Sequence, residues 1–300
     1  MNADSQDKSK RCNSGSDPSQ TLRPRRRPLH PSVLVTDLDG TLIRSNGTIS
    51  ERTRAALERA QQSGAVLIYA TGRRTDWMVP QLELPVSGAY GICSNGARLV
   101  ELENGQTIDE FPMSKALTIT ALTTLHRAIP TMHFAADCSS GFYVEENFKY
   151  SWRLRSGAIP ASIMSVVTAG DQVYKLTAFC DGIPEEKLCG RIDHILHGLL
   201  RTTYGASSGI VELTAPDIDK GAGLDRIARI LNLDMSNAIA FGDAPNDIPI
   251  FDRVGWAIAV ANAHRDLLKR ADEIVASNNA DGVAAVIEEL LGNSNTGRSR

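Results

Sequence analysis

Asp37 and Asp39 lie one residue apart, directly after an apolar, β-branched run at residues 33–35 and before a Gly-Thr turn. Side chains two residues apart on a strand share a face, so the two carboxylates are expected to lie close together. Close carboxylates need a positive partner, and Mg²⁺, which prefers oxygen ligands, is the simplest candidate. The alternative is an ordinary Asp-Gly turn with solvated carboxylates, and this stretch alone leaves both interpretations open.

Other polar residues also stand where apolar runs end. Thr71 follows a buried-strand pattern, the segment 242–247 (Gly-Asp-Ala-Pro-Asn-Asp) follows another, and Lys220 begins a predicted helix. Ligands bind at the carboxyl ends of the strands in open α/β sheets, so these residues are expected to meet there. Such a rim, with several carboxylates, one ammonium, a hydroxyl and an amide, suits Mg²⁺-dependent phosphate chemistry. Lys220, Thr71 and the N–H groups of the Gly40 and Gly72 turns can hold phosphate oxygens.

Two common nucleotide-binding motifs are absent from the sequence. There is no Gly-x-x-x-x-Gly-Lys-Ser/Thr loop, so a nucleotide-triphosphatase P-loop is not indicated. There is also no Gly-x-Gly-x-x-Gly after the first predicted strand, which weakens a dinucleotide-binding interpretation.

The predicted elements alternate as β-α-β-α-β at the start of the chain, which is typical of an α/β fold with a parallel sheet. A middle region has shorter, more polar strands with alternating patterns, typical of a separate α+β domain. Capping and periodicity predict helices at residues 50–63, 75–84, 114–128, 184–199, 220–231 and 281–291. The predicted organisation is a Rossmann-like, doubly wound parallel sheet core at 31–112 and 211–292, an inserted α+β domain at 113–210, and disordered tails at 1–30 and 293–300.

Charge and cysteine content limit the partners and the compartment. The first 31 residues carry seven of the 32 Lys and Arg but only three of the 35 Asp and Glu, which leaves the rest of the chain at net −7. An acidic body argues against nucleic acid as the main partner, and the basic run 23–28 is better explained as a solvated tail than as a contact with nucleic acid or anionic lipid. Five widely spaced cysteines without a CxxC pair indicate a reducing, cytoplasmic setting. No apolar run reaches about 18 residues, so no membrane span is expected. The sequence does not indicate an oligomeric state.

Four ordered segments resemble the motifs of the haloacid-dehalogenase-like (HAD) phosphatases. They are Asp37-Leu-Asp39-Gly-Thr41, Thr71-Gly-Arg73, Lys220-Gly221 and Gly242-Asp243-x-x-Asn246-Asp247. Two further segments, 94–97 (Ser-Asn-Gly-Ala) and 281–290, resemble the Cof-like branch, which carries a large α+β cap of type IIB between the second and third motifs. The resemblance covers residues 31–292, and Ala244 and Ile250 depart from it only where bulkier residues or Met are frequent.

The resemblance implies a role for each motif residue. Asp37 would be the nucleophile that forms an aspartyl-phosphate, and Asp39 would be the general acid and base. Mg²⁺ would be held by the Asp37 side chain, the Asp39 backbone carbonyl, Asp243 and, directly or through water, Asp247. The phosphate would be held by Thr71, Gly72, Lys220 and Asn246.

Several residues stay open between a function and an ordinary structural role. Arg73 could contact phosphate or form a salt bridge at a helix start, and Asn95 could face the site or serve its Asn-Gly turn. The cap residues Asp137, Glu145 and Lys175 could contact substrate but are more often solvated at such positions. The four histidines of the inserted region show no ligand spacing and are expected on the surface or in packing: His126, His133, His194 and His197.

The resemblance implies a Mg²⁺-dependent phosphatase for a small phosphomonoester, and a sugar phosphate is the expected class because a large cap screens a small substrate from water. A hexose phosphomutase of the related branch would share the nucleophile and the cap type. A non-catalytic binding protein on the same fold is the third alternative, disfavoured because all the motif acids are present.

Overall fold

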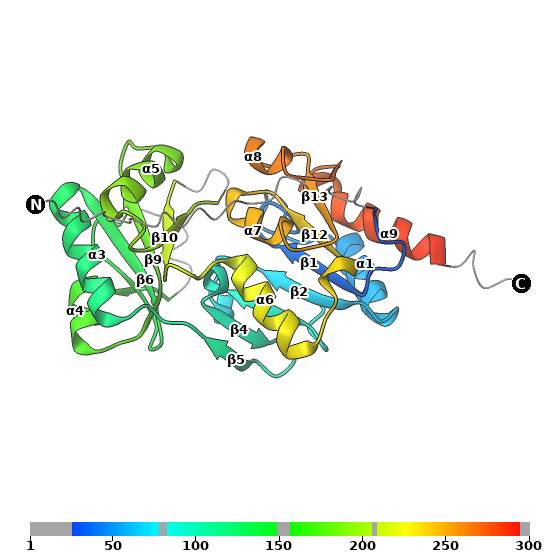
Figure 1. Cartoon of the computed structure of the whole chain (residues 1–300), viewed down its shortest axis with the longest axis horizontal. Coiled ribbons are helices and arrows are strands. Elements are labelled where there is room, and N and C mark those ends of the chain that lie inside the picture. The colour runs from blue at the N-terminus through cyan, green and yellow to red at the C-terminus, as the bar shows by residue number, and fades with distance from the viewer. Residues whose placement is uncertain (1–25, 78–82, 149–156, 206–208, 295–300) are drawn as a thin grey trace, which may run out of the picture.

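The computed structural model describes residues 26–77, 83–148, 157–205 and 209–294. These residues form two units that each contain a β-sheet (Figure 1). Each unit has a separate hydrophobic core. The second unit is inserted into the first, between its last antiparallel strand and a helix that begins at Lys220. We call the first unit the core and the second, residues 113–214, the cap.

The core sheet has eight strands within the described residues. Their order is β14 (Glu273–Val275), β13 (Trp256–Val260), β12 (Ala238–Gly242), β1 (Val33–Asp37), β2 (Val66–Ala70), β3 (Tyr90–Cys93), β4 (Arg98–Glu101) and β5 (Gln106–Glu110). The strands from β14 to β3 are parallel, whereas β4 and β5 are antiparallel at one edge. The predicted α/β fold with a mainly parallel sheet is confirmed. Strand β1 lies at the centre and is buried along its whole length, as its apolar sequence requires.

The core helices begin where the sequence has capping residues. Helix α1 (Glu51–Gln62) is capped by the Ser50 side chain, which accepts from the Thr53 N–H, and it packs against α9 (Gly282–Ser294). Helix α6 (Lys220–Leu231) is capped by Asp219 and packs against the short helix α7 (Ile248–Phe251) (Figure 1). These bounds agree with the predicted helices at 50–63, 220–231 and 281–291 to within a few residues.

The cap sheet has six strands in the part of the chain that the structure describes. Their order is β10 (Arg201–Thr203), β11 (Val211–Thr214), β9 (Val173–Cys180), β6 (Met132–Cys138), β7 (Phe142–Val144) and β8 (Ile159–Pro160). Apart from the parallel β7–β8 pair, neighbouring strands are antiparallel. The cap helices α3 (Lys115–Ala128), α4 (Ile163–Ala169) and α5 (Glu185–Leu196) contribute to its core.

Some predicted boundaries were wrong. The core was expected to resume at residue 211, but β11 is hydrogen-bonded to β9 and β10, so the cap sheet continues to Thr214. Helix α4 was not predicted, because it is short and rich in Val and Ile, which favour strands. Helix α9 extends to Ser294, past the predicted end of the core at 292. Residues 75–77 are helical, and most of the rest of the helix predicted at 75–84 lies outside the described residues.

The predicted N-terminal tail is described only from residue 26 onward. There Arg27 Nη1 lies 3.3 Å from Glu289 Oε2 and 3.5 Å from Glu273 Oε1, so this basic residue forms ion pairs with acidic residues of the core. None of the helices within the described ranges has the length and apolar character needed to cross a membrane.

Candidate active site

The carboxyl ends of β1, β2 and β12 bring the predicted residues to one rim of the core sheet. In the register of β1 with β2, Asp37 lies opposite Ala70, so Thr71 follows directly beside it. In the register of β1 with β12, Thr36 lies opposite Phe241, so Gly242 and Asp243 continue on the other side. Parallel strands make this convergence unavoidable once the three apolar runs pair in this order.

Lys220 is the cation at the centre of this rim. It is the first residue of α6, and its Nζ donates to Asp37 Oδ1 and to Asp247 Oδ1, each at 2.6 Å. The Lys220 side chain is fully buried, so these two carboxylates provide the charge compensation that a buried ammonium needs. Burial would lower the pKa of Lys220, but Asp247 and Asp37 outweigh it and raise that pKa. Lys220 is therefore charged.

Asp243 and Asp247 are held by the turn that follows β12. Asp247 Oδ2 accepts from the backbone N–H groups of Asp243 and Ala244, both at 3.1 Å. The Thr41 hydroxyl donates to Asp243 Oδ1 at 3.3 Å. Gly40 is required beneath this carboxylate, because its φ is +84° and an added Cβ would lie 2.2 Å from Asp243 Oδ2. The motif glycine thus creates the space that Asp243 occupies.

The rim carries more negative than positive charge. Oxygens of Asp37, Asp243 and Asp247 lie within 4.8 Å of one another and all three residues are buried, while Lys220 supplies a single positive charge. Burial raises the pKa of Asp37 to about 7, against the opposing effect of Lys220. Burial, with the charges of Asp37 and Asp247, raises the pKa of Asp243 well above its usual range. Asp37 Oδ2 is buried and has no hydrogen-bond partner among the described residues. This acidic cluster could bind a metal ion, and a divalent cation fits its charge and its oxygen donors.

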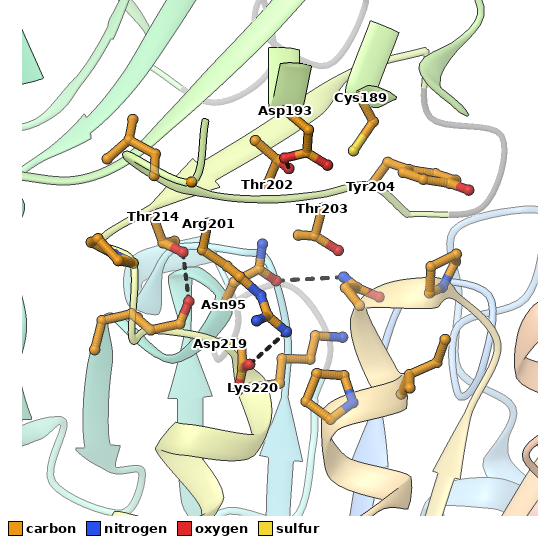
Figure 2. Close-up of a pocket in the computed structure, with 18 residues that line it drawn as sticks. Asn95, Cys189, Asp193, Arg201, Thr202, Thr203, Tyr204, Thr214, Asp219 and Lys220 are labelled. Atoms are coloured by element: carbon orange, nitrogen blue, oxygen red, sulfur yellow. Dashed lines mark hydrogen bonds and ion pairs between the residues drawn. The ribbon is translucent and has the colours of Figure 1, made fainter. Parts of the chain in front are cut away.

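Thr71 and Asn246 line the same rim. The Thr71 hydroxyl accepts from the Arg73 N–H at 3.0 Å, and its side chain is fully buried. The Asn246 amide donates to Asn95 Oδ1 at 3.4 Å, drawn as a dashed line in Figure 2. Asn246 Oδ1 is buried and finds no partner in the described parts of the chain. Such an orphaned acceptor normally pairs with water or a ligand.

Asp39 has an unexpected partner. Arg73 Nε donates to Asp39 Oδ2 at 2.7 Å and Arg73 Nη2 to Asp39 Oδ1 at 2.6 Å, a bidentate ion pair. The sequence left Arg73 open between a phosphate contact and a salt bridge at a helix start. The structure shows a salt bridge: Arg73 stands two residues before the helical residues 75–77, and its partner is the second aspartate of the first motif.

Asn95 lies in a turn with left-handed backbone geometry. Ser94, Asn95 and Gly96 have φ values of 50°, 55° and 97°. Asn95 nevertheless also reaches other residues of the site: its amide donates to Glu212 Oε2 at 2.8 Å. The turn and the site explanations therefore both apply to this residue.

Two of the three cap candidates reach the rim of the core. Lys175 donates to the Gly72 carbonyl at 2.5 Å, and Asp137 accepts from Arg74 at 2.6 Å. Glu145 does not reach it, because its carboxylate accepts from the Phe134 N–H inside the cap.

The histidines have ordinary roles where their contacts are described. His126 packs edge-on against Phe134, and His194 packs against His197. No histidine belongs to a potential metal-binding cluster in the described part of the chain.

Sequence reasoning missed Arg74, Ser94 and Glu212 as contacts of this region. Ser94 donates to Asp137, and Glu212 accepts from both Lys175 and Asn95. A usable signal existed for Glu212, since it stands as a single charged residue inside an apolar strand. Asp137 in β6 and Lys175 in β9 show the same pattern.

A cavity of about 500 Å³ adjoins the rim and is lined by residues of both units. Asn95 and Lys220 line it on the core side, while Arg201 and Tyr204 line it on the cap side (Figure 2). Asn246 also lines it. This volume is typical of small-molecule sites.

Comparison with known proteins identifies the family. The sequence model of the haloacid dehalogenase-like hydrolases matches residues 34–287, and the chain belongs to this family. It is 28% identical over 280 residues to 5-amino-6-(5-phospho-D-ribitylamino)uracil phosphatase YwtE of Bacillus subtilis (strain 168), with 86% of this chain and 97% of that protein covered. It is 25% identical over 270 residues to pyridoxal phosphate phosphatase YbhA of Escherichia coli (strain K12), with 86% and 98% covered.

The fold is also similar to that of solved structures. It superposes on the HAD subclass IIB sugar phosphatase BT4131 with a TM-score of 0.74 and 20% identity, covering 87% of this chain and 99% of that one. The predicted family is thereby confirmed, and with it the predicted class of enzyme, a phosphoric monoester hydrolase. The superposition shows that the fold, including the cap, is that of a subclass IIB protein.

Proposed function

We propose that this protein is a Mg²⁺-dependent phosphatase that hydrolyses a small phosphomonoester through an aspartyl-phosphate on Asp37. The observation that carries the proposal is the state of the Asp37 carboxylate. One oxygen is bound by the buried Lys220 ammonium, and the other is buried without a partner among the described residues. A buried, unsatisfied carboxylate oxygen is costly unless it meets a cation or a reacting atom.

Mg²⁺ would be held by the side chains of Asp37 and Asp243 and by the Asp39 backbone carbonyl. Asp247 already accepts from Lys220 and from two backbone N–H groups, so it would support the site directly or through a water. When bound, the ion would offset the carboxylate charge and polarise a phosphoryl oxygen. The three clustered carboxylates with one ammonium support this assignment.

The first half-reaction uses both aspartates of the first motif. A carboxylate oxygen of Asp37 attacks phosphorus and forms a new P–O bond while the ester P–O bond breaks. The Asp39 carboxyl gives its proton to the departing alcohol oxygen. In the second half, water attacks phosphorus, loses a proton to the Asp39 carboxylate, and displaces Asp37, which releases inorganic phosphate.

The remaining motif residues would bind the phosphoryl group. Lys220 contributes a fixed positive charge next to Asp37. The Thr71 hydroxyl, the Gly72 turn and the Asn246 amide would donate to phosphoryl oxygens as negative charge develops on them. Asn246 would also orient Asp37 or the phosphate.

A small polyhydroxylated ester such as a sugar phosphate is the proposed substrate class. The cavity has room for a leaving group beyond the phosphate, and polar residues of the cap line it. Two of the relatives are named for small phosphate esters, 5-amino-6-(5-phospho-D-ribitylamino)uracil and pyridoxal phosphate. The cap would exclude water and provide specificity.

Phosphate release from a panel of esters tests the proposal. The panel contains sugar phosphates, polyol phosphates, nucleotides, flavin mononucleotide, pyridoxal phosphate and p-nitrophenyl phosphate, each with and without Mg²⁺. The wild-type protein should release phosphate from at least one ester only with Mg²⁺, and Asp37→Asn should be inactive. Activity retained in Asp37→Asn would exclude Asp37 as the nucleophile. An isomerised hexose phosphate without free phosphate would indicate a mutase instead.

A further inference from the structure

The cap contacts a short segment of the core rim, residues 72–74, at both ends. At one end, Lys175 Nζ from β9 donates to the Gly72 carbonyl at 2.5 Å. At the other end, Arg74 Nη1 donates to Asp137 Oδ1 from β6 at 2.6 Å. Asp137 lies opposite Lys175 in the register of β6 and β9, so both contacts come from one position of the cap sheet.

These charged groups are buried at the junction of cap and core. Asp137 is 1% exposed and Lys175 is 6% exposed. Glu212 completes the arrangement, because it accepts from Lys175 and from the Asn95 amide. Desolvation offsets the attraction within a buried ion pair, so its net contribution to stability is small. Each buried charge must still meet its partner, so these contacts fix the placement of the cap against the core.

Arg73 lies between the two residues that contact the cap, Gly72 and Arg74, and it binds Asp39. Its guanidinium makes both hydrogen bonds to the Asp39 carboxylate. Its backbone is also tied on both sides: the N–H donates to Thr71 Oγ1 at 3.0 Å and the carbonyl accepts from the Ser94 N–H at 2.9 Å. A shift of residues 72–74 would therefore move the Arg73–Asp39 pair.

We propose that Lys175, Asp137 and Glu212 are positioning residues, which couple the placement of the cap to the placement of the acid–base group Asp39 through Arg73. The inference rests on the proposed function, in which Asp39 protonates the leaving alcohol. As the proton leaves Asp39, a negative charge develops on its carboxylate, and the guanidinium fork of Arg73 stabilises that charge. The cap contacts with Gly72 and Arg74 hold the Arg73 guanidinium in its position beside Asp39.

This role predicts a dependence on the leaving group. An alkoxide leaves poorly and needs the proton, whereas p-nitrophenolate is a stable anion and leaves without it. For each ester, kcat/KM reports the steps of the first half-reaction, up to release of the leaving group. Displacing Asp39 should therefore lower kcat/KM for an alkyl phosphate much more than for p-nitrophenyl phosphate. A purely structural role would lower both equally.

The experiment compares Asp137→Asn and Lys175→Met with the wild type on p-nitrophenyl phosphate and on the best alkyl phosphate of the panel. The matched control is Glu186→Gln, which removes an exposed ion pair between cap and core, Arg265 to Glu186 at 2.7 Å. We expect kcat/KM for the alkyl ester to fall about 10- to 100-fold in both variants, since one positioned acid–base group is typically worth roughly 10²–10⁴. The aryl ester and the control should change less than about threefold.

A second readout needs no turnover. Hydrogen exchange of the amides at residues 71–75 should be faster in Asp137→Asn and Lys175→Met than in the wild type, and unchanged in Glu186→Gln. If Lys175→Met does not fold, the nearly isosteric Asp137→Asn still tests the inference, and Lys175→Arg should restore the alkyl rate. Equal losses on both esters, or no loss on either, would overturn the coupling. Failure of the wild type on every ester would instead overturn the proposed function.

Discussion

Lys220 and Asp37 form a buried ion pair across 183 residues of chain, with Nζ 2.6 Å from Oδ1. Asp37 ends the central strand of the core sheet, and Lys220 begins the first helix after the cap. The same ammonium also binds Asp247. The pair thus joins the core segments on either side of the cap at the bottom of the candidate site.

Lys220→Met should destabilise the protein strongly. The substitution leaves buried carboxylates without their ammonium, and breaking a buried pair from one side typically costs about 3–5 kcal/mol of unfolding free energy. Urea denaturation followed by circular dichroism measures the change. Lys269→Met is the control, because it removes an exposed ion pair between Lys269 and Asp266. The denaturation midpoint of this variant should barely move. A midpoint unchanged in Lys220→Met would show that the buried pair is not intact in solution.

Mg²⁺ should raise the melting temperature, and Asp243→Asn should abolish this shift. A ligand that binds only the folded state stabilises it, by about 2.7 kcal/mol at a concentration of 100 Kd. Differential scanning fluorimetry with increasing Mg²⁺, after treatment with EDTA, gives the result without any substrate. An Mg²⁺-independent melting temperature in the wild type would argue against a metal site formed by Asp37, Asp243 and Asp247.

Gly40→Ala should impair the site more than it impairs the fold. Its Cβ would overlap Asp243 Oδ2 at 2.2 Å, so the carboxylate must move. Gly47→Ala is the matched control, because Gly47 has a similar φ of +81° but nothing within 4 Å. Both variants should lose about 1–2 kcal/mol through left-handed strain.

The two alanine variants should then separate in activity and in the Mg²⁺-induced melting shift. Gly40→Ala should lose both, whereas Gly47→Ala should retain both. Equal activities for the two variants would mean that Asp243 tolerates displacement.

Asp281 should stabilise the protein at neutral pH and stop doing so in acid. Burial alone would raise its pKa, but hydrogen bonds from Arg44 and Ser50 outweigh it and hold the pKa below its usual value of 3.8. A depressed folded-state pKa gives stability that is present above the unfolded pKa and lost as the pH falls through the folded one.

Asp281→Asn is a suitable test, since Asn tolerates the left-handed φ of 56° at this position. The wild type should be more stable than the variant at pH 7, and the difference should begin to shrink as the pH falls toward 3.8 and continue to shrink below it. Unfolding free energies from urea titrations at several pH values measure it. A difference that stays constant down to pH 3 would show that the Asp281 charge contributes nothing.

The sequence by itself determined the core sheet and the acidic rim. Apolar runs predicted β1, β2 and β12, and parallel pairing of such strands forces their carboxyl ends together. Asp37, Asp243 and Asp247 could therefore be placed near one another without coordinates. Lys220 could be assigned to the same rim because it begins a helix that returns to this edge.

Only the tertiary structure decided which long-range polar partners meet at the junction of cap and core. The Lys175 contact with Gly72 depends on how the cap sits on the core. The Arg73–Asp39 pair depends on how the loops after β1 and β2 fold, and the extension of the cap to Thr214 depends on the pairing of β11 with β9. Strand periodicity is a local property and says which face a side chain takes, but not what it meets across a domain junction. A buried charge finds its partner through the packing of distant segments, and the physical reason is the cost of leaving it unpaired.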